Sequence, residues 1–315
     1  MSKLRPQNEP IVFINNAGAL GDCVATTPVI KYAIENIWAN GKYRLMVNDY
    51  FKCLFPFVPE DKFLPMTKHS LVYGVFGDER YGWKMLNDSI VALDGHASGL
   101  ISGEKMSLID YASVKFLGKV LPESAKKYPK LNLENVDIDR FNLPEKYACI
   151  VSVTAHKIRR IPDEEQEKIV KWLIKNGITP VYVGKSEREV AVTQLGDTYG
   201  KTFVSKGINL IDKTSILECA KVMSKAVCVI GADTGLVHLA GMTDVPVLCG
   251  YTTVSPDVRA VDRVIPIVPE IDTCRFCQSD AYLYNNDFNL CPIQTNECAK
   301  DMRANKFIEQ IYKLL

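Results

Sequence analysis

The chain has 315 residues, of which 47% are hydrophobic, and this length and apolar content are enough for two hydrophobic cores. Its 38 basic and 37 acidic residues give a formal net charge of +1, which excludes a strong overall field for holding nucleic acid or an anionic membrane surface. Residues 1–10 are polar and no apolar run approaches the ~20 residues that cross a bilayer, so we expect a soluble cytoplasmic protein.

The first part of the chain alternates strand and helix patterns. An apolar strand at 11–14 leads through a glycine-containing turn at 18–22 into a helix pattern over 23–38. Pro28 lies inside this pattern, so we expect it near the first turn of the helix or at a kink. Further along, the patterns predict two strands and a helix, over 44–47, 90–93 and 108–117.

The segment over 118–146 is rich in Lys, Pro, Asn and Asp and indicates a linker between two domains. We place the first domain at 1–143 and the second at 147–300. The second is predicted to contain a buried strand, a polar loop, a helix, a strand and a further helix, over 148–153, 154–161, 162–175, 179–183 and 214–224. Both halves therefore have the pattern of doubly wound α/β domains.

The stretch over 227–250 carries the strongest signal for chemistry. An apolar strand ends in the turn Asp233-Thr234-Gly235, a small-residue helix follows, and a second apolar strand comes next. The amides of such a turn favour an anion, with a nucleotide diphosphate as the natural ligand, and His238 lies one turn further along the helix. The residues alone leave another interpretation open, in which Asp233 only caps the helix and His238 is a core histidine.

The ten cysteines fall into two groups. Six are scattered, several of them within apolar runs, and are expected to be reduced core residues: Cys23, Cys53, Cys149, Cys219, Cys228 and Cys249. The other four lie in a loop-like segment over 274–298, where a C-x2-C pair precedes two more widely spaced thiols: Cys274, Cys277, Cys291 and Cys298. This pattern leaves two interpretations open, a structural zinc or other thiolate-bound metal, or free or disulfide-paired thiols.

Two of these segments resemble the signatures of one family. The turn at 233–235 with the His-Leu-Ala helix at 238–240 resembles the donor-site signature of glycosyltransferase family 9, the heptosyltransferase-like glycosyltransferases. Gly-Asp at 21–22 with Thr-Thr-Pro at 26–28 resembles a second signature of that family. The resemblance implies a GT-B fold, with two Rossmann-like domains facing across an active-site cleft, the acceptor on the first and the donor on the second. It also implies that a C-terminal helix over 303–315 packs back on the first domain.

The resemblance further implies roles for single residues. Asp22 takes the position of the family's proposed general base, with helix capping as its alternative. Arg159 stands where family members carry a lysine for the donor phosphates, and Lys157 or Arg160 are the alternatives. On the donor side, Glu187 takes the position of a ribose-binding carboxylate, and the sequence does not distinguish it from Glu189. Thr154 supplies a hydroxyl group. The signature turn and its helix supply Asp233, Thr234, Gly235, Leu236 and His238. The acceptor-side turn contains Gly18 and Gly21.

These expectations describe an inverting enzyme that moves a sugar from a nucleotide-diphosphate sugar to a hydroxyl of a surface glycan or lipopolysaccharide-type saccharide. No catalytic metal is expected. An Asp-x-Asp motif can hold a divalent metal on the donor diphosphate, but the Asp-x-Asp sequence at 137–139 falls in the linker. Two alternatives stay open: transfer to a hydroxylated DNA base, with Lys126 and Lys127 lining a groove, and a catalytically idle nucleotide-binding or interaction module on the same fold. Peripheral membrane contact is compatible with the sequence, which specifies neither the donor's base and sugar nor the oligomeric state.

Overall fold

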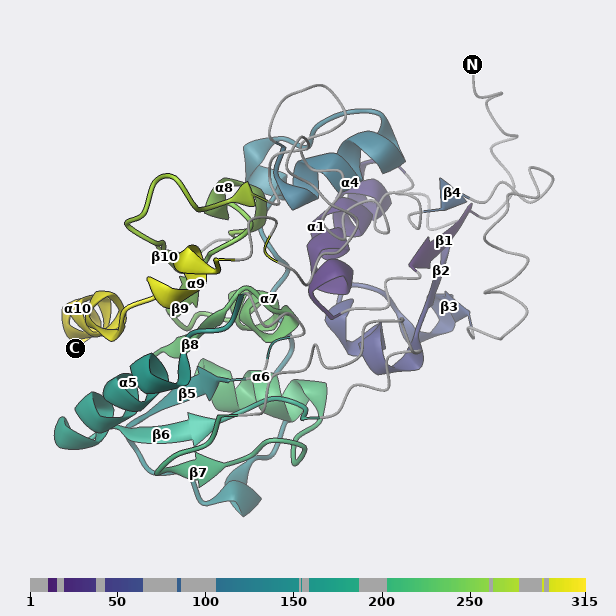
Figure 1. Ribbon diagram of the computed structural model, residues 1–315. Coiled ribbons are helices and arrows are strands. Elements are labelled where there is room, and N and C mark those ends of the chain that lie inside the picture. The colour runs from purple at the N-terminus through teal and green to yellow at the C-terminus, as the bar shows by residue number, and fades with distance from the viewer. Residues whose placement is uncertain are drawn as a thin grey trace. The chain divides into compact units, whose positions relative to one another are not determined.

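The computed structural model describes residues 11–15, 20–37, 43–64, 84–85, 106–152, 154, 159–186, 203–260, 263–277, 291 and 295–315 (Figure 1). The chain divides into two compact units, Met1–Leu131 and Asn132–Leu315. The segment over 132–146 belongs to the second unit, although the sequence places most of it in the first domain. Contacts explain this assignment, because Lys221 Nζ donates to the carbonyl of Leu133 and Arg140 pairs with Glu218 at 2.7 Å.

The first unit is built on a parallel four-stranded sheet in the order β3-β2-β1-β4. Its described strands are β1 (Ile11–Asn15), β2 (Tyr43–Val47), β3 (Phe63–Leu64) and β4 (Lys84–Met85), and its described helices are α1 (Leu20–Asn36) and α4 (Leu108–Leu117), which contact each other. Short 3-10 helices lie at Asp49–Leu54, Glu60–Lys62 and Glu123–Ala125. The predicted strands at 11–14 and 44–47 and the helix at 108–117 are confirmed, whereas the predicted strand at 90–93 lies outside the described residues.

Helix α1 accommodates a proline in its interior. The helix begins at Leu20, so Pro28 lies two turns inside it and the expected position near the first turn is wrong. Proline has no N–H to donate to the carbonyl of Val24 four residues earlier. The hydroxyl of Thr27 donates to that carbonyl at 2.8 Å, and the hydroxyl of Thr26 donates to the carbonyl of Cys23 at 2.8 Å. The Thr-Thr-Pro sequence therefore supplies its own replacement for the missing hydrogen bond.

The second unit is built on a parallel six-stranded sheet in the order β10-β9-β8-β5-β6-β7. Its strands are β5 (Tyr147–Val151), β6 (Thr179–Tyr182), β7 (Ile208–Asn209), β8 (Val229–Ala232), β9 (Val247–Gly250) and β10 (Val264–Ile267). The chain fills one side of the sheet outward from β5, then returns to β8 on the other side of β5. This is the 3-2-1-4-5-6 order of dinucleotide-binding domains, and its topological switch point lies between β5 and β8.

The helices in the described part of this unit are α5 (Asp163–Lys175), α6 (Ile216–Ser224), α7 (Gly235–Gly241), α8 (Pro256–Arg259), α9 (Glu297–Lys300) and α10 (Ala304–Leu314), with a 3-10 turn at Asp139–Phe141. Acidic residues occupy the first turn of α5, and Gly177 follows its end with a φ of 70°, as the sequence predicts. A capping box opens α6, because the side chains of Ser215 and Glu218 each bond to the other's backbone amide. Within the described residues, no helix is long and apolar enough to span a membrane.

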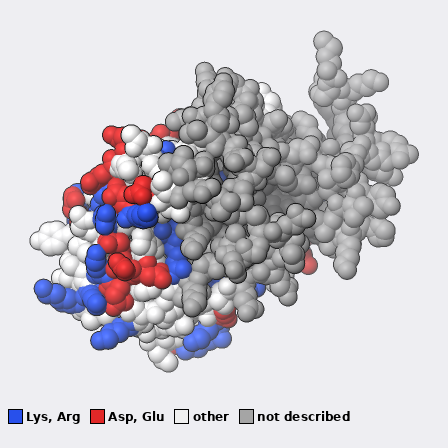
Figure 2. All heavy atoms as spheres, in the orientation of Figure 1, with Lys and Arg blue, Asp and Glu red and all other residues white. Residues whose placement is uncertain are grey.

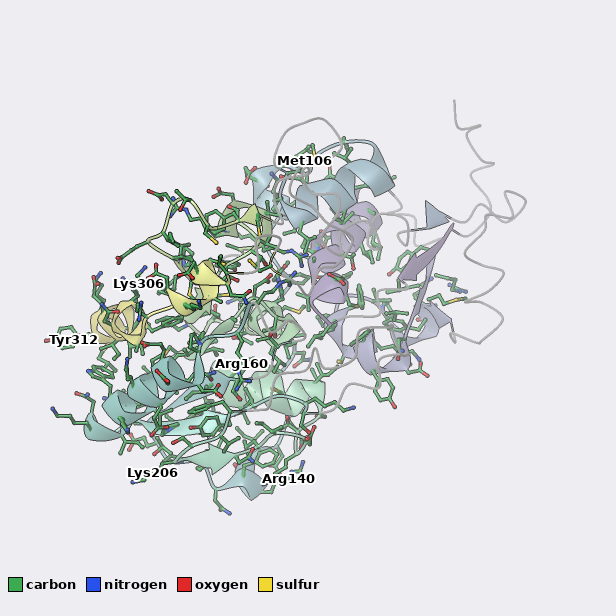
Figure 3. All side chains as sticks on the ribbon, in the orientation of Figure 1. Met106, Arg140, Arg160, Lys206, Lys306 and Tyr312 are labelled. Atoms are coloured by element: carbon green, nitrogen blue, oxygen red, sulfur yellow. The ribbon has the colours of Figure 1, made fainter. Side chains whose placement is uncertain are left out.

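The C-terminal helix α10 belongs to the second unit, where it packs on α5. Its expected packing on the first domain stays a prediction. Phe307 and Ile311 of α10 are completely buried in one apolar cluster with Ile169 and Leu173 of α5. The carboxylate of Glu165 on α5 accepts a hydrogen bond from the amide of Ala304 at 2.7 Å and so caps the start of α10. On the other side of α10, Tyr312 points into solvent (Figure 3).

Candidate functional site

The carboxyl ends of three neighbouring strands bring polar side chains to one edge of the second sheet. Thr154 and Arg159 follow β5, the turn from Asp233 follows β8, and buried hydroxyl groups follow β9. Ligands of open α/β sheets bind at this edge, at the switch point, which here lies between β5 and β8. Gly231 keeps these elements close, because a Cβ atom there would lie 2.9 Å from Val151 Cβ.

The signature turn forms the start of α7. Thr234 is the cap residue, and its hydroxyl accepts a hydrogen bond from the amide of Leu236 at 3.3 Å. The alternative in which Asp233 only caps the helix is therefore wrong, since Thr234 does this. Asp233 is held one residue earlier, with its amide donating to the carbonyl of Gly250 at the end of β9. Its carboxylate is left to make other contacts.

The carboxylate of Asp233 lies between cationic and hydrogen-bonding side chains. Its Oδ2 accepts from Arg159 Nη1 at 3.2 Å, and its Oδ1 lies 3.5 Å from His238 Nε2. All three side chains are buried. Burial alone would raise the pKa of Asp233, but the hydrogen bond from His238 and the charges of Arg159 and Arg259 outweigh it and hold the pKa well below its usual value. Asp233 is therefore an ionised acceptor at neutral pH.

Arg259 is a residue of this edge that the sequence analysis missed. It is the last residue of α8, it is buried, and its charge acts on Asp233. The Ser-Pro-Asp sequence at 255–257 is a helix-start signal five residues after the end of β9, with Ser255 as the cap that accepts from the amide of Asp257. That signal places Arg259 at the end of one helical turn but does not say where its side chain points.

The other predicted donor-side residues are partly described. Thr154 is buried at the edge, whereas Glu187, Glu189 and Lys157 lie outside the described residues. Arg160, labelled in Figure 3, pairs with Asp163 at the start of α5. The sequence analysis gave no role to Ser152, whose buried hydroxyl has no hydrogen-bond partner among the described residues. A buried hydroxyl of this kind at the ligand edge suits a polar ligand or a water molecule.

The chain is also anchored immediately before Glu187. Asp212, whose φ is 62°, accepts from the amide of Ser186 at 2.9 Å and also pairs with its hydroxyl. The amide of Asp212 donates to the carbonyl of Gly184. These contacts fix the carboxyl end of β6, which adjoins β5 at the same edge.

In the first unit, Asp22 lies in the first turn of α1 and is buried together with Gly21. A carboxylate in a first helical turn is stabilised as the anion by the helix dipole. Gly18 lies outside the described residues.

The cysteine-rich segment is attached close to the candidate site. Cys291 and Cys298 are buried and Cys274 and Cys277 are partly buried. Burial and the neighbouring thiols of the other three raise the pKa of Cys298 to about 12, so the four lie near one another. Between the C-x2-C pair, the amide of Phe276 donates to the carbonyl of Thr252 in the loop after β9. In the part of the chain that the structure describes, no group of three or more His, Cys, Asp or Glu side chains is arranged to hold a metal.

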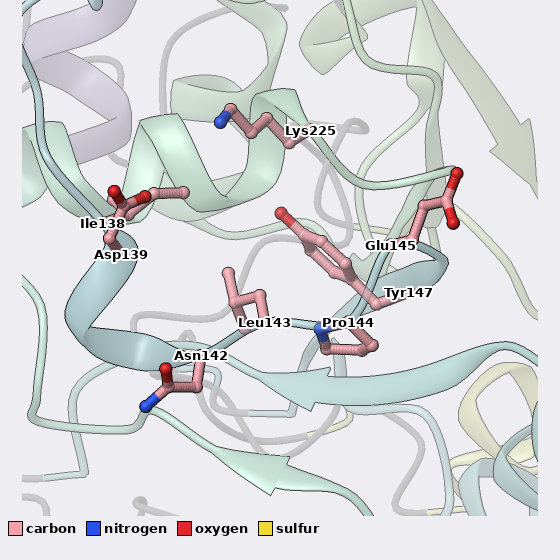
Figure 4. Close-up of a pocket in the computed structure, with 8 residues that line it drawn as sticks. All are labelled: Ile138, Asp139, Asn142, Leu143, Pro144, Glu145, Tyr147 and Lys225. Carbon is pink, nitrogen blue, oxygen red and sulfur yellow. The ribbon is translucent and has the colours of Figure 1, made fainter.

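A pocket of the second unit lies elsewhere. It measures about 480 Å³ and is lined by residues of 138–147 and by Lys225 (Figure 4). Tyr147, at the amino end of β5, forms part of its wall, so the pocket belongs to the opposite edge of the sheet from Asp233. It is therefore separate from the candidate site.

A family model for glycosyltransferase family 9 (heptosyltransferase) matches residues 63–276, which is more than half of the chain and includes Arg159, Asp233 and Arg259. The chain belongs to this family. It is therefore a glycosyltransferase, as the two signature segments predict. A search of curated proteins found no match.

Solved structures of heptosyltransferases share the fold of this family 9 chain. The iron-containing dodecameric glycosyltransferase TibC from enterotoxigenic E. coli H10407 gives a TM-score of 0.72 at 16% identity, covering 99% of this chain and 77% of TibC. E. coli ADP-heptose lipopolysaccharide heptosyltransferase II gives 0.62 at 14% identity, covering 97% and 98%. E. coli WaaC, solved with ADP-2-deoxy-2-fluoro heptose, gives 0.54 at 15% identity, covering 97% and 100%. These similarities confirm the predicted GT-B fold class.

Proposed function

We propose that this family 9 enzyme is an inverting heptosyltransferase that uses ADP-heptose and transfers the sugar to a hydroxyl of a lipopolysaccharide-type or other surface glycan. The observation that carries the proposal is the buried Arg159–Asp233–His238 group at the switch point of a nucleotide-type sheet. The choice of donor is supported by similar proteins, because TibC was solved with ADP-D-β-D-heptose and WaaC with a fluorinated ADP-heptose.

The donor diphosphate binds at the turn from Asp233 to Leu236 in this proposal. Backbone amides at the turn and the guanidinium of Arg159 offset the negative charge that develops as the nucleotide leaves. Arginine keeps the charge of the family's lysine and adds a planar fork that suits phosphate oxygens. Thr154 and Thr234 supply hydroxyl groups, His238 holds Asp233, and Glu187 binds the ribose.

Asp22 is the general base in the same proposal. Its carboxylate takes the proton from the acceptor hydroxyl, whose oxygen forms a bond to the anomeric carbon as the bond to the diphosphate breaks on the opposite face. A single base is enough for this displacement, which inverts the configuration at that carbon. A β-linked donor therefore gives an α-linked product.

The reaction proceeds without a metal on the diphosphate. The pair Asp137 and Asp139 forms a local turn instead, because the side chain of Asp137 accepts from the amide of Asp139 at 2.8 Å. Arg159 and the turn amides supply the positive charge that a divalent ion would otherwise provide.

The four cysteines at 274–298 hold one structural metal ion in this proposal. TibC is described as iron-containing, and thiolates bind iron as well as zinc. The other three thiols lie close enough to Cys298 to raise its pKa, and a bound ion would draw the described side chains, which are not arranged as a ligand set, together. Four thiolate ligands leave no position for catalysis. Bound metal would tie the C-x2-C pair to the buried Cys291 and Cys298.

A glycan is favoured over a DNA base as the acceptor. Figure 2 shows acidic and basic side chains interspersed over the described surface of the face in view. This described surface has no basic stripe that would suit the phosphate backbone of a nucleic acid. The net charge of +1 agrees with this distribution.

A nucleotide panel tests the donor assignment. Thermal unfolding of the purified protein is measured with ADP, UDP, GDP and CMP, and ADP should raise the melting temperature most by mass action. Arg159→Met should abolish most of that shift, whereas Arg160→Gln, which removes a side chain paired with Asp163, should preserve it. A larger shift with another nucleotide would overturn the choice of ADP, and no shift with any nucleotide would favour a catalytically idle interaction module.

A further inference from the structure

The loop after β9 is built around buried polar side chains that the proposed function does not use. Thr252, Thr253 and Ser255 are buried, and the amide of Arg259 donates to the carbonyl of Ser255 at 3.3 Å. Arg259 itself is only 7% exposed. Burying an arginine requires anionic or hydrogen-bonding partners, so the surroundings of Arg259 close to the donor edge must supply such groups.

The segments that carry Arg159 and Arg259 follow the two strands on either side of β8, the strand that leads into the signature turn. Strand β8, which leads into Asp233, lies between β5 and β9. Arg159 follows β5, and Arg259 follows β9 through α8. The amide of Asp233 bonds to the carbonyl of Gly250, which joins the turn directly to the end of β9. The segment after each of the two neighbouring strands thus carries one buried arginine.

Both guanidinium groups act on the same carboxylate. Arg159 contacts Asp233 directly, and the charge of Arg259 also lowers the pKa of Asp233. Asp233 is therefore an anionic neighbour of both cations at this edge. A diphosphate brings two phosphate groups, and each can be met by the planar fork of one arginine.

We propose that Arg259, in the segment that follows β9, binds the diphosphate of the nucleotide-sugar donor as a second cation besides Arg159. This assignment rests on the proposed function of the turn as the donor site. Arg259 then helps to hold the leaving group in the ground state and to offset the charge that grows on its oxygens as the glycosidic bond breaks. The buried loop over 251–255 and the bond from Phe276 to Thr252 fix the helix that carries it.

Binding measurements separate this role from that of a counter-ion for Asp233 alone. Calorimetry with ADP, adenosine and inorganic pyrophosphate is carried out on the wild type, Arg259→Gln and Arg259→Lys. Arg259→Gln should weaken ADP and pyrophosphate by about tenfold or more and leave adenosine unchanged, because only the phosphates lose a charged partner. Arg259→Lys keeps the charge without the planar fork, so its affinities for ADP and pyrophosphate should fall between those of the wild type and Arg259→Gln. The matched control is Arg263→Gln, which removes a half-exposed arginine paired with Asp244.

Each outcome decides the assignment. Equal ADP and pyrophosphate affinity in the wild type and Arg259→Gln would overturn it, as would an equal loss for adenosine, which indicates damage to the whole site. If Arg259→Gln does not fold, Arg259→Lys decides, since an unchanged ratio of pyrophosphate to adenosine affinity would also overturn the role. A wild type that binds neither ADP nor pyrophosphate, nor UDP, GDP or CMP, contradicts the proposed function itself, and this result is distinct from a failure at Arg259 alone.

Discussion

At the scale of single residues, Asp233 organises the candidate site. It is a buried carboxylate, and burial would favour its neutral form, yet His238 and two arginines hold it ionised. Removing one member of such a group leaves an uncompensated charge in a low-dielectric environment, which is costly. The identities of Asp233, Arg159 and His238 are therefore interdependent, and the family signature around them has a physical reason.

Asp22→Asn tests the assignment of the general base. The amide cannot take the acceptor proton, so we expect kcat to fall by about 10²- to 10⁴-fold, the usual contribution of general base catalysis. Donor affinity should be unchanged, because the residues assigned to the donor lie in the second unit. The measurement pairs steady-state kinetics with calorimetric binding of ADP.

The matched control for this prediction is Asp49→Asn, which changes an exposed aspartate of the same unit. It should leave kcat at the wild-type value. An Asp22→Asn enzyme with wild-type kcat would exclude Asp22 as the base.

At the scale of secondary-structure elements, the second sheet could be predicted well from sequence. The strands at β5, β6, β8 and β9 and the helices α5 and α6 follow directly from apolar runs and capping residues. The docking of α10 could not be predicted, because the same amphipathic pattern is compatible with either unit. What decides it is a distant partner, the carboxylate of Glu165 at the helix start, together with the apolar face of α5.

Helix α1 shows a second limit, because the pattern predicts its start at Cys23 and so allows Pro28 near its first turn. Gly21 and Asp22, just before Cys23, are residue types typical of turns. The helix begins at Leu20 and tolerates the proline through Thr27.

Thr27→Val tests this compensation. The substitution keeps the shape but removes the hydroxyl that bonds to the carbonyl of Val24, so the free energy of unfolding should fall by about 1 kcal/mol. In a Pro28→Ala background the alanine amide can donate to the same carbonyl, and the cost of Thr27→Val should shrink. Urea unfolding of the four proteins measures the coupling. An identical cost in both backgrounds would contradict the explanation.

Glu165→Gln tests the capping of α10. The variant should lose about 1–2 kcal/mol of unfolding free energy at pH 7. Hydrogen bonds from Lys168 and the amide of Ala304 outweigh burial and lower the pKa of Glu165 in the folded protein. Its stabilisation is therefore present above the unfolded pKa of about 4.3 and is lost as the pH falls through the lower folded value.

The difference in stability between the wild type and Glu165→Gln, measured by urea unfolding, should accordingly narrow as the pH falls below about 4.3. Glu167→Gln, on the same helix and paired with Lys171, is the control and should change stability little. A difference that stays constant with pH would show that the carboxylate charge is not responsible.

At the scale of the whole molecule, topology turns scattered residues into a site. Arg159 and Asp233 are far apart in sequence, and the return of the chain from β7 to β8 brings them into contact. The signature turn and the residues after β5 could be predicted because each lies beside a strand with a clear apolar pattern. Arg259 could not, because nothing in a local pattern says that α8 directs it toward Asp233.

Metal analysis tests the role of the cysteine segment. The purified protein should contain about one iron or zinc ion per chain, as expected for four thiolate ligands, measured by inductively coupled plasma mass spectrometry. Cys298→Ser should lower the metal content, while Cys53→Ser, in the first unit, should not. Metal-free wild-type protein with four free thiols at 274–298 would contradict the proposal.

The central claim is that the chain transfers heptose from ADP-heptose with inversion. It is tested most directly by proton NMR of the sugar released or transferred from ADP-D-β-D-heptose by the wild-type enzyme. Inversion predicts that the first product formed has the α configuration, with one ADP released for each sugar. A β product, or no ADP released under conditions in which ADP binds, would contradict the account.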